Sequence, residues 1–306
     1  MKLLIITQKV DKDDPILGFF HRWIEEFAKR FEKVTVVCLE KGRNELPAEV
    51  KVLSLGKENG RSRMKYLAWF YRYIWQERKN YDAVFVHMNQ EYVILGGLVW
   101  KLFGKKVALW RNHRKGNWLT RLAVSLADIV FYTSPQSFTA GFKKAMMMPV
   151  GVDTDLFRPH PEIERNPNSI LFLGRISPVK RVDVFVERLK EMRRAGKPFT
   201  ATIVGSPTDR DGAYHEKIKK MISDYSLGDL VIMKPAVKHE DTVGYYCSHE
   251  IYANFTEIGS MDKTIFEAAA CGAKVETENG IIWKDVDLKG QGLERLADKI
   301  THEISA

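Results

Sequence analysis

The sequence predicts an α/β protein made of two Rossmann-like, doubly wound domains. Short apolar runs rich in β-branched residues alternate along the chain with amphipathic segments, which is typical of parallel sheets covered by helices. The 306 residues are enough for two domains of roughly 150 residues each. Residues 149–168 separate two such series, and their Pro- and Asp-rich composition is that of a linker. We therefore expect one domain over 1–150 and a second over 151–306.

The first series begins with KLLIIT (2–7), a mainly apolar run that predicts a buried strand. It lacks the cleavage pattern of a signal peptide. Five further runs predict the rest of a parallel sheet, and the amphipathic stretches between them predict its helices. The further strands are expected at 33–39, 49–55, 83–87, 106–110 and 128–133, and the helices near 17–31, 61–79, 90–103, 116–127 and 135–144.

The second series alternates in the same way. Gly196 and Gly272 follow two of its amphipathic stretches, at the position of the glycine that ends a helix. Because ligands of such sheets bind beyond the carboxyl ends of the strands, we expect the site in a central cleft that the two domains face. The strands are expected at 169–174, 199–205, 230–234, 250–255 and 273–277, and the helices near 181–195, 212–225, 239–247, 263–271 and 291–304.

Composition restricts the compartment and the partners. The longest uncharged apolar run, 92–100, is far shorter than the ~18 residues that a membrane-spanning helix needs. Three scattered cysteines without metal-ligand spacing suit a reducing cytoplasm. Residues 1–160 carry 27 Lys and Arg against 16 acidic residues, whereas 161–306 carry 21 against 23. The basic half favours an anionic partner, such as a phosphorylated acceptor, a membrane face or nucleic acid, although solubility charge explains it equally well.

The segment LFLGRISPVKRVD (171–183) has the pattern of a phosphate-binding turn. A buried strand ends at Gly174, and Arg175 and Lys180 flank the turn that opens a helix. Glycine lets the backbone come close to a ligand, the helix start offers free N–H groups, and the cations neutralise charge. The combination fits a pyrophosphate leaving group. The alternative is two solvated cations beside a tight turn.

The segment TEIGSMDKTIFEAAACGAKV (256–275) predicts a helix that carries a functional carboxylate. Asp262 can cap this helix, and Glu267 lies in its second turn. A carboxylate there can accept hydrogen bonds from both ribose hydroxyls of a nucleotide. The alternative is a solvated i,i+4 pair between Lys263 and Glu267. The small residues at 268–272 argue against it, because they indicate a closely packed helix.

Together these two segments resemble the family 4 glycosyltransferases, which have the GT-B fold of two Rossmann-like domains. The segments QKVDKDDPILGFFHRW, LWRNHR and PVGVDTDLFRP also look like parts of that family, so the resemblance spans nearly the whole chain. It implies a retaining hexosyltransferase that uses a UDP- or GDP-linked sugar and a glycan or lipid-linked acceptor, in polysaccharide or glycolipid synthesis. The chain after Glu267 is shorter than is usual in the family. The helix that crosses back to the first domain would therefore be reduced to about 291–304.

The resemblance also implies roles for single residues. Gly174, Arg175 and Lys180 would hold the donor diphosphate, and Glu267 would hold the ribose. Gly18, in the loop after the first strand, would let the chain approach the donor phosphates or the acceptor.

Contact with the transferred sugar is implied for two places. His113 matches the family histidine that contacts this sugar, although a lone loop histidine without that pattern is more often structural. The family usually has two glutamates in an E-x7-E pattern, and Gly259 stands where the first is expected. The stretch GSMDK resembles a sub-pattern in which Asp and Lys precede the helix. In this sub-pattern Gly259, Ser260 and Met261 would bind the donor sugar. Asp262 or Lys263 would replace the missing glutamate in its catalytic contact with the sugar. The alternative is that the activity is weakened.

No metal and no cofactor are expected beside the nucleotide-sugar co-substrate. Three D-x-D triplets, at 153–155, 209–211 and 285–287, match the metal-chelating motif of the other glycosyltransferase fold. None follows a buried strand, so we interpret them as turns. Arg175, Lys180 and a helix N-terminus would stabilise the departing diphosphate instead. The resemblance implies front-face transfer, in which the leaving phosphate helps to deprotonate the acceptor hydroxyl.

The stretch RSRMKYLAWFYRYIWQERKN (61–80) interleaves basic and aromatic residues on a predicted helix. Its aromatics at 66, 69, 70 and 73 share one face, which could anchor on an anionic bilayer or pack against the first sheet. The basic half favours an amphipathic acceptor, such as a polyprenyl-diphosphate-linked sugar, and so does a cluster of Phe19, Phe20 and Trp23. We therefore expect a cytoplasmic enzyme, peripheral at the inner face of the plasma membrane.

Two rival functions stay open at this level. A nucleotide-sugar 2-epimerase shares the fold, but it needs acid and base side chains placed for elimination, whereas residues 174–180 and 267–272 indicate transfer. The other rival is a non-catalytic protein that binds anions or nucleic acid through the basic half. No nucleic-acid partner is expected, because no RNA- or DNA-binding signature is present.

Overall fold

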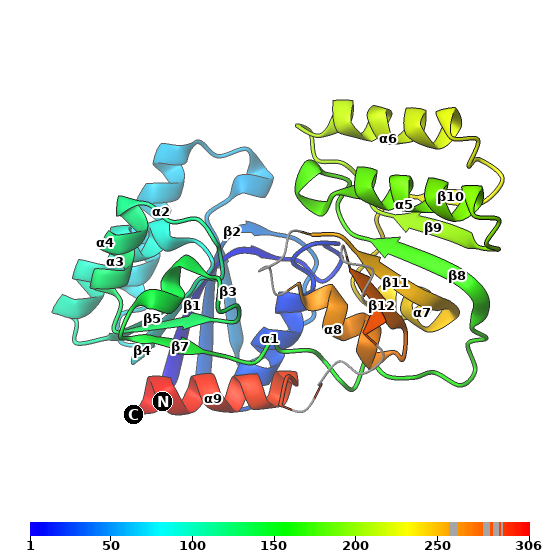
Figure 1. Ribbon diagram of the computed structural model, residues 1–306. Coiled ribbons are helices and arrows are strands. Elements are labelled where there is room, and N and C mark those ends of the chain that lie inside the picture. Colours follow the sequence, from blue (N-terminus) through cyan, green and yellow to red (C-terminus); the bar gives the residue numbers. More distant parts are fainter. Residues whose placement is uncertain (257–261, 278–281, 284–287, 289) are drawn as a thin grey trace. The chain divides into compact units, whose positions relative to one another are not determined.

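The computed structural model describes residues 1–306 except 257–261, 278–281, 284–287 and 289. The chain divides into two compact units (Figure 1). Unit 1 comprises Met1–Gly151 and Gly290–Ala306, and unit 2 comprises Val152–Lys289. Each unit has its own mainly parallel sheet with helices on both faces, so the predicted class of two doubly wound α/β domains is confirmed.

The sheet of unit 1 has seven strands in the order β3-β2-β1-β4-β5-β6-β7, all paired in parallel. The order reverses beside β1, which is the arrangement of a Rossmann-like sheet. The strands are β1 (Lys2–Val10), β2 (Lys33–Lys41), β3 (Val50–Ser54), β4 (Ala83–His87), β5 (Lys106–Trp110), β6 (Ile129–Tyr132) and β7 (Ala145–Met147).

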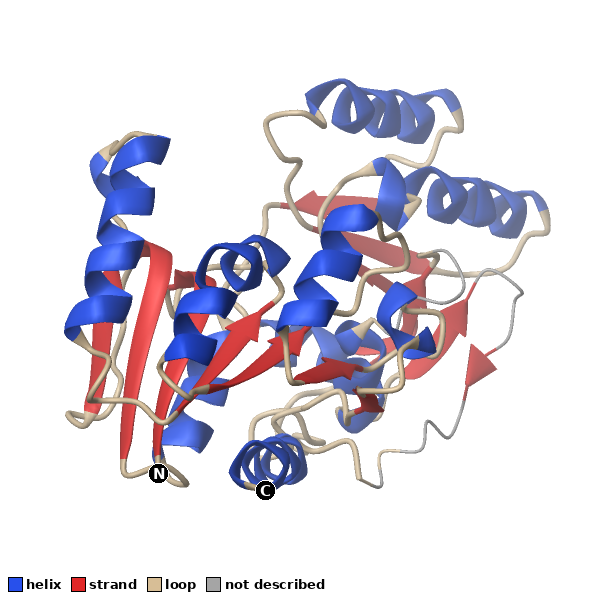
Figure 2. Ribbon diagram, turned by 90° about the vertical axis from the view of Figure 1, so that its left-hand side faces the viewer, coloured by secondary structure: helices blue, strands red, loops and turns tan. Residues whose placement is uncertain are grey.

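Side chains alternate across this sheet and so build two cores. Leu3 and Ile5 of β1 contribute to the core beneath α1 (Phe19–Ala28) and α9 (Leu293–Ser305). Leu4 and Ile6 contribute to the core on the other face. That second face is covered by α2 (Arg63–Gln76), α3 (Gln90–Leu102) and α4 (Trp118–Leu126) (Figures 1 and 2).

The helix that we expected at 135–144 is wrong. Only a short 3₁₀ turn, Phe138–Gly141, forms there, and the unpredicted strand β7 follows it. The Ser134 and Ser137 hydroxyls accept hydrogen bonds from the backbone N–H groups of Gln136 and Thr139, at 3.2 and 3.4 Å. Such local side-chain bonds compete with a helix for the same backbone groups.

The aromatic residues of unit 1 lie mostly inside it. Phe70 of α2 is buried, and Tyr66, Trp69 and Tyr73 pack against the same core, so this face of the helix covers the sheet. Phe20 and Trp23 of α1 are buried in the core on the other face of the sheet. Phe20 and Trp23 therefore offer no exposed ring to an acceptor, because burying these rings in the core is more favourable than exposing them to water, and Phe19 is half-buried against the same core.

The sheet of unit 2 has the order β10-β9-β8-β11-β12-β13 among the described residues, with only β13 antiparallel. Helices α5 (Val182–Arg194) and α6 (Gly212–Asp224) pack on one face, and α7 (Thr242–Ser248) and α8 (Lys263–Ala270) lie on the other (Figure 1). Gly196 and Gly272 have φ of +64° and +83°, which confirms them as helix-ending glycines. The strands are β8 (Asn166–Leu173), β9 (Thr200–Val204), β10 (Val231–Lys234), β11 (His249–Asn254), β12 (Lys274–Thr277) and β13 (Ile282–Trp283).

Candidate functional site

The carboxyl ends of β8 and β11 are neighbours in the sheet of unit 2, where the strand order reverses. In doubly wound sheets this switch point is where ligands bind, because the loops that leave it go to opposite faces. The loop after β8 leads to α5, and the loop after β11 leads to α8. Lys180 after β8 and Asp262 before α8 therefore meet at one edge of the sheet.

The backbone is closely packed at the end of β8. The Gly174 N–H donates to the Val204 carbonyl at 3.0 Å, and Gly205 has a φ of +158°. A Cβ atom on Gly205 would lie 1.9 Å from the Gly174 carbonyl oxygen, so no larger residue fits. This contact fixes the course of the candidate phosphate-binding turn.

Arg175 and Lys180 lie on opposite sides of this turn. Arg175 is exposed and makes no hydrogen bond or ion pair with the residues that the structure describes. Lys180 ends a short 3₁₀ helix, Pro178–Lys180, and its ammonium group donates to the Asp262 carboxylate. One cation is thus open to an anion in solution, and the other is already held in place.

Asp262 is the centre of a polar cluster at the start of α8. Its side chain accepts from the Thr264 backbone N–H at 3.4 Å, which confirms the predicted N-cap, and from Asn254 Nδ2 at 3.1 Å. Burial raises the pKa of this carboxyl, but the Lys180 charge and the hydrogen bonds outweigh burial and lower the pKa to about 2. Asp262 is therefore a carboxylate at neutral pH.

Glu267 is buried one turn further along α8, with 2% of its surface exposed. Its Oε1 accepts from His239 Nε2 at 2.9 Å and lies 3.7 Å from the Lys263 ammonium. Burial raises the Glu267 pKa, and the charges of His239 and Lys263 lower it, with a net downward shift. The pair of Lys263 with Glu267 exists, but the solvated position that we considered as the alternative is wrong.

The other predicted sugar contacts of unit 2 are not placed. Gly259, Ser260 and Met261 lie outside the described residues, as does the triplet 285–287. In the first triplet, Asp153 Oδ1 accepts from the Asp155 backbone N–H at 3.3 Å, which is the geometry of a turn. Within the described ranges, no three His, Cys, Asp or Glu side chains gather in a way that could hold a metal ion.

Gly18 precedes α1 in unit 1. A Cβ atom there would lie 2.5 Å from the Asp14 carbonyl oxygen and 2.9 Å from that of Lys12. The loop is also held by the Asp14 carboxylate, which accepts from the Leu17 N–H at 2.7 Å and pairs with Lys9. The structure therefore requires glycine at 18 for the packing of its own loop.

His113 lies in the exposed loop after β5 of unit 1. Its Nδ1 accepts from the Lys115 backbone N–H at 3.0 Å, which orients the ring. Arg111 crosses beneath this loop, donating to Gln90 Oε1 at 2.8 Å and to the Lys115 carbonyl at 2.9 Å. Burial lowers the Arg111 pKa. The histidine ring is thus fixed by its own loop, with Nε2 pointing away from the bonded edge.

Three residues of the unit 2 cluster were not singled out from the sequence. His239 follows β10, and its ring packs at a tilt against the Phe157 ring, with 5.0 Å between the ring centres, which helps to fix its imidazole against Glu267. Asn254 and Thr256, at the end of β11, both donate to Asp262. Only their position after a buried strand could have indicated them.

Two family models match the chain. Residues 16–110 match the family described as glycosyl transferase 4-like, and residues 153–275 match the family described as glycosyl transferases group 1. The second match contains Arg175, Lys180, Asp262 and Glu267.

Curated relatives resemble parts of the chain. A D-inositol 3-phosphate glycosyltransferase of Kineococcus radiotolerans is 26% identical over 145 residues, which are 43% of this chain and 33% of that protein. A GDP-mannose-dependent alpha-(1-6)-phosphatidylinositol monomannoside mannosyltransferase of Mycolicibacterium smegmatis is 25% identical over 171 residues, 49% of this chain and 44% of that protein. The similarity thus spans between a third and a half of the length of these relatives.

Solved structures show the same fold at low identity. HepE of Anabaena, in complex with UDP and glucose, has a TM-score of 0.69 and 17% identity, covering 90% of this chain and 80% of HepE. Sucrose-phosphate synthase of Thermosynechococcus elongatus has a TM-score of 0.69 and 16% identity, covering 100% of this chain and 91% of the synthase. Both similarities concern the architecture of two Rossmann-like units.

Proposed function

Because this chain belongs to the group 1 and 4-like glycosyltransferases, we propose that it moves a hexose from a nucleotide diphosphate sugar to a glycan or lipid-linked acceptor. The proposal rests above all on one observation in unit 2. Two cations beside a glycine turn, Arg175 and Lys180, lie at the same sheet edge as the buried carboxylate Glu267. A diphosphate and its adjoining ribose need these two kinds of group near each other.

We propose UDP or GDP as the leaving nucleotide. HepE was crystallised with UDP, and the mycolicibacterial relative is named as GDP-mannose-dependent, which supports a donor from this class. In the proposed complex Arg175 and Lys180 bind the diphosphate, and Glu267 accepts hydrogen bonds from the ribose. Gly174 leaves room for the phosphates, and Gly18 bounds the acceptor side.

The reaction that we propose needs no metal ion. As the bond to the sugar breaks, negative charge develops on the leaving diphosphate, and fixed cations can stabilise it. Lys180 has three N–H donors, so it can bind a phosphate oxygen while it keeps its bond to Asp262. We therefore propose Asp262 as a positioning residue for Lys180, with Lys263 positioning Glu267 in the same way.

The transfer itself is proposed to retain the anomeric configuration. The departing phosphate oxygen takes the proton of the acceptor hydroxyl as that hydroxyl attacks the same face of the sugar. His113, held in its loop by Lys115, is proposed to contact the transferred sugar. We place this activity in the cytoplasm, where nucleotide sugars are used.

Thermal unfolding in the presence of UDP, GDP, ADP and their sugars tests the donor class. A nucleotide at a hundredfold excess over its Kd stabilises the protein by about 2.7 kcal/mol, so the correct one will raise the Tm. Arg175→Ala and Lys180→Ala are each expected to lose this shift, whereas Arg194→Ala, an exposed arginine near the end of α5, keeps it. No shift with any nucleotide would instead favour the non-catalytic rival.

Product analysis separates transfer from epimerisation. With UDP-N-acetylglucosamine and no acceptor, NMR is expected to show no 2-epimer. Accumulation of the epimer would overturn the proposed transferase activity in favour of the 2-epimerase.

A further inference from the structure

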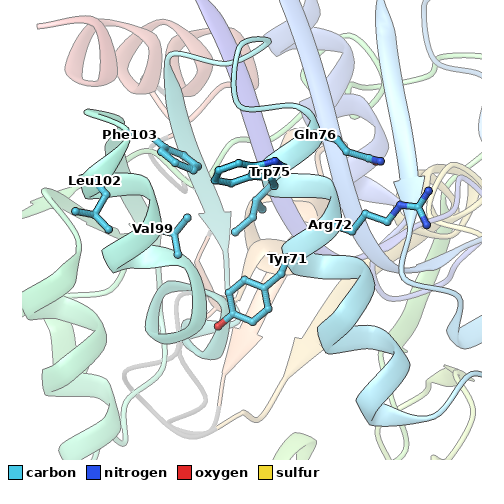
Figure 3. A pocket seen from close by; sticks show the side chains of 8 residues that line it. Tyr71, Arg72, Trp75, Gln76, Val99, Leu102 and Phe103 are labelled. Atoms are coloured by element: carbon cyan, nitrogen blue, oxygen red, sulfur yellow. The ribbon is translucent and has the colours of Figure 1, made fainter.

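The outer surface of α2 and α3 in unit 1 has a pocket that the proposed reaction does not use. Its volume is about 620 Å³, within the range of roughly 300–1,000 Å³ that is common for small-molecule sites. Apolar and aromatic side chains dominate the lining, and the Trp75 and Phe103 rings lie 5.7 Å apart across it (Figure 3). The pocket is lined by Tyr71, Arg72, Ile74, Trp75, Gln76, Val99, Leu102 and Phe103.

Large apolar side chains stay exposed around this pocket. Trp75 is 56% exposed, Leu102 85% and Leu98 64%. These residues do not belong to the aromatic face of α2 that covers the sheet, and they are not part of the core of unit 1. Exposed apolar side chains around a pocket are typical of a site that binds a ligand, another protein or a membrane.

The segment that contains both helices is basic. Residues 61–105, all of which the structure describes, carry eight Lys and Arg against three acidic residues. Two of the three acids are engaged within the unit: Glu77 is buried and bonds Lys51, and Asp82 accepts from the Lys2 backbone N–H. Arg72 and Lys101 are exposed on the two helices. This pattern complements a negatively charged plane.

The pocket lining includes only three polar side chains, those of Tyr71, Arg72 and Gln76. The Tyr71 hydroxyl donates to the Leu95 carbonyl at 3.0 Å, and the Arg78 guanidinium lies 4.4 Å from the Trp75 ring centre. A protein partner usually forms about one hydrogen bond per 100–200 Å² of interface, and this surface offers little for that. A hydrocarbon chain needs no hydrogen bonds.

We propose that the α2–α3 surface docks on an anionic phospholipid bilayer, with an acyl chain of one lipid in the pocket. Trp75 and Leu102 enter the apolar layer, while Arg72 and Lys101 bind phosphates at the level of the headgroups. This inference is independent of the transfer reaction, because none of these residues belongs to the donor site.

Vesicle co-sedimentation of the full chain tests the proposal. Wild-type protein is expected to bind vesicles of equal phosphatidylcholine and phosphatidylglycerol, and to bind pure phosphatidylcholine much more weakly. The double variant Trp75→Ser, Leu102→Ser is expected to lose at least about tenfold in partitioning, because two exposed anchors are removed. The matched control Ile232→Ser, which changes a residue that is 60% exposed on β10, is expected to bind normally.

Lipids brominated on the acyl chain test the depth of Trp75. They are expected to quench part of the tryptophan fluorescence of the wild type, and Trp75→Phe is expected to remove that quenching while binding persists. Absence of binding to anionic vesicles, unchanged binding of the double variant, or unchanged quenching in Trp75→Phe would each overturn the proposal. So would a concentration-dependent dimer that the double variant abolishes without any vesicle binding, because a second copy would then cover the pocket.

Discussion

Lys180 and Asp262 form an ion pair that joins the turn after β8 to the start of α8, across 82 positions of the chain. Asn254 and Thr256 bond the same carboxylate. The turn with the candidate phosphate-binding residues and the helix with Glu267 are thereby held together without a ligand. Such preorganisation lowers the cost of ordering the site when a substrate binds.

The charge of Asp262 is predicted to stabilise unit 2 in a pH-dependent way. Its folded pKa of about 2 lies below the ordinary 3.8, so the stabilisation is present above about pH 4 and is lost as the pH falls through about 2. Asp262→Asn keeps an N-cap oxygen and is expected to cost about 2 kcal/mol at pH 7. Urea unfolding of both proteins between pH 7 and 2 measures the difference. Asp229→Asn, at an exposed pair with Arg193, is the control, and a difference independent of pH would contradict the prediction.

Glu267 is predicted to bind the ribose hydroxyls. Glu267→Gln keeps the shape but removes the charge, and charge-assisted hydrogen bonds contribute about 1.5–3 kcal/mol each, so affinity for the preferred nucleotide should fall by at least tenfold. Calorimetry with the nucleotide and its 2′-deoxy analogue makes the test specific. The wild type should discriminate between the two ligands, and Glu267→Gln should do so far less. Equal discrimination by both proteins would show that Glu267 does not contact the 2′-hydroxyl; Glu250→Gln serves as control.

His239 is predicted to set the pH range over which the nucleotide binds. The imidazole bonds Glu267 and lowers the pKa of that carboxyl, against the opposing effect of burial. The binding form is the carboxylate, so the wild type should keep its affinity below the ordinary pKa of a glutamate. His239→Gln retains a hydrogen-bond donor but removes the electrostatic effect of the imidazole on Glu267. The Glu267 pKa should then rise. As the pH is lowered, the variant should therefore lose affinity at a higher pH than the wild type does. Coincident pH profiles for the two proteins would exclude this role.

His113 is predicted to act on the transferred sugar and not on the nucleotide. The ring lies in unit 1, and no donor contact is assigned to its loop. His113→Ala should therefore keep the thermal shift with the nucleotide and lose most of the turnover, by roughly the 10²–10⁴-fold typical of a positioned acid–base or sugar contact. His302→Ala, at an exposed histidine on α9, should change neither quantity. Loss of the thermal shift in His113→Ala would place the residue in nucleotide binding or folding.

The fold was predictable because its signals are local. Apolar runs of five to seven residues predicted each major strand, and Gly196 and Gly272 marked helix ends that need a positive φ. The prediction for residues 135–147 was wrong for two reasons. Ser134 and Ser137 form local hydrogen bonds with the backbone, and the three residues of β7 are too few to show a period.

The site was predictable only in part. Arg175, Lys180, Asp262 and Glu267 occur in contiguous motifs that the sequence displays directly. His239 meets Glu267 only after the sheet brings the ends of β10 and β11 to one edge, and nothing in its own neighbours indicates this contact. The aromatics of 61–80 had the correct helical face, but only the packing distinguishes Phe70 in the core from Trp75 at the surface.

A crystal structure of the chain with the nucleotide that gives the largest thermal shift tests the central claim most directly. We predict the diphosphate against Arg175 and Lys180, with both ribose hydroxyls within hydrogen-bonding distance of Glu267. The account would be contradicted if the phosphates bound elsewhere and the Glu267 carboxylate stayed hydrogen-bonded to His239 alone, away from the ribose.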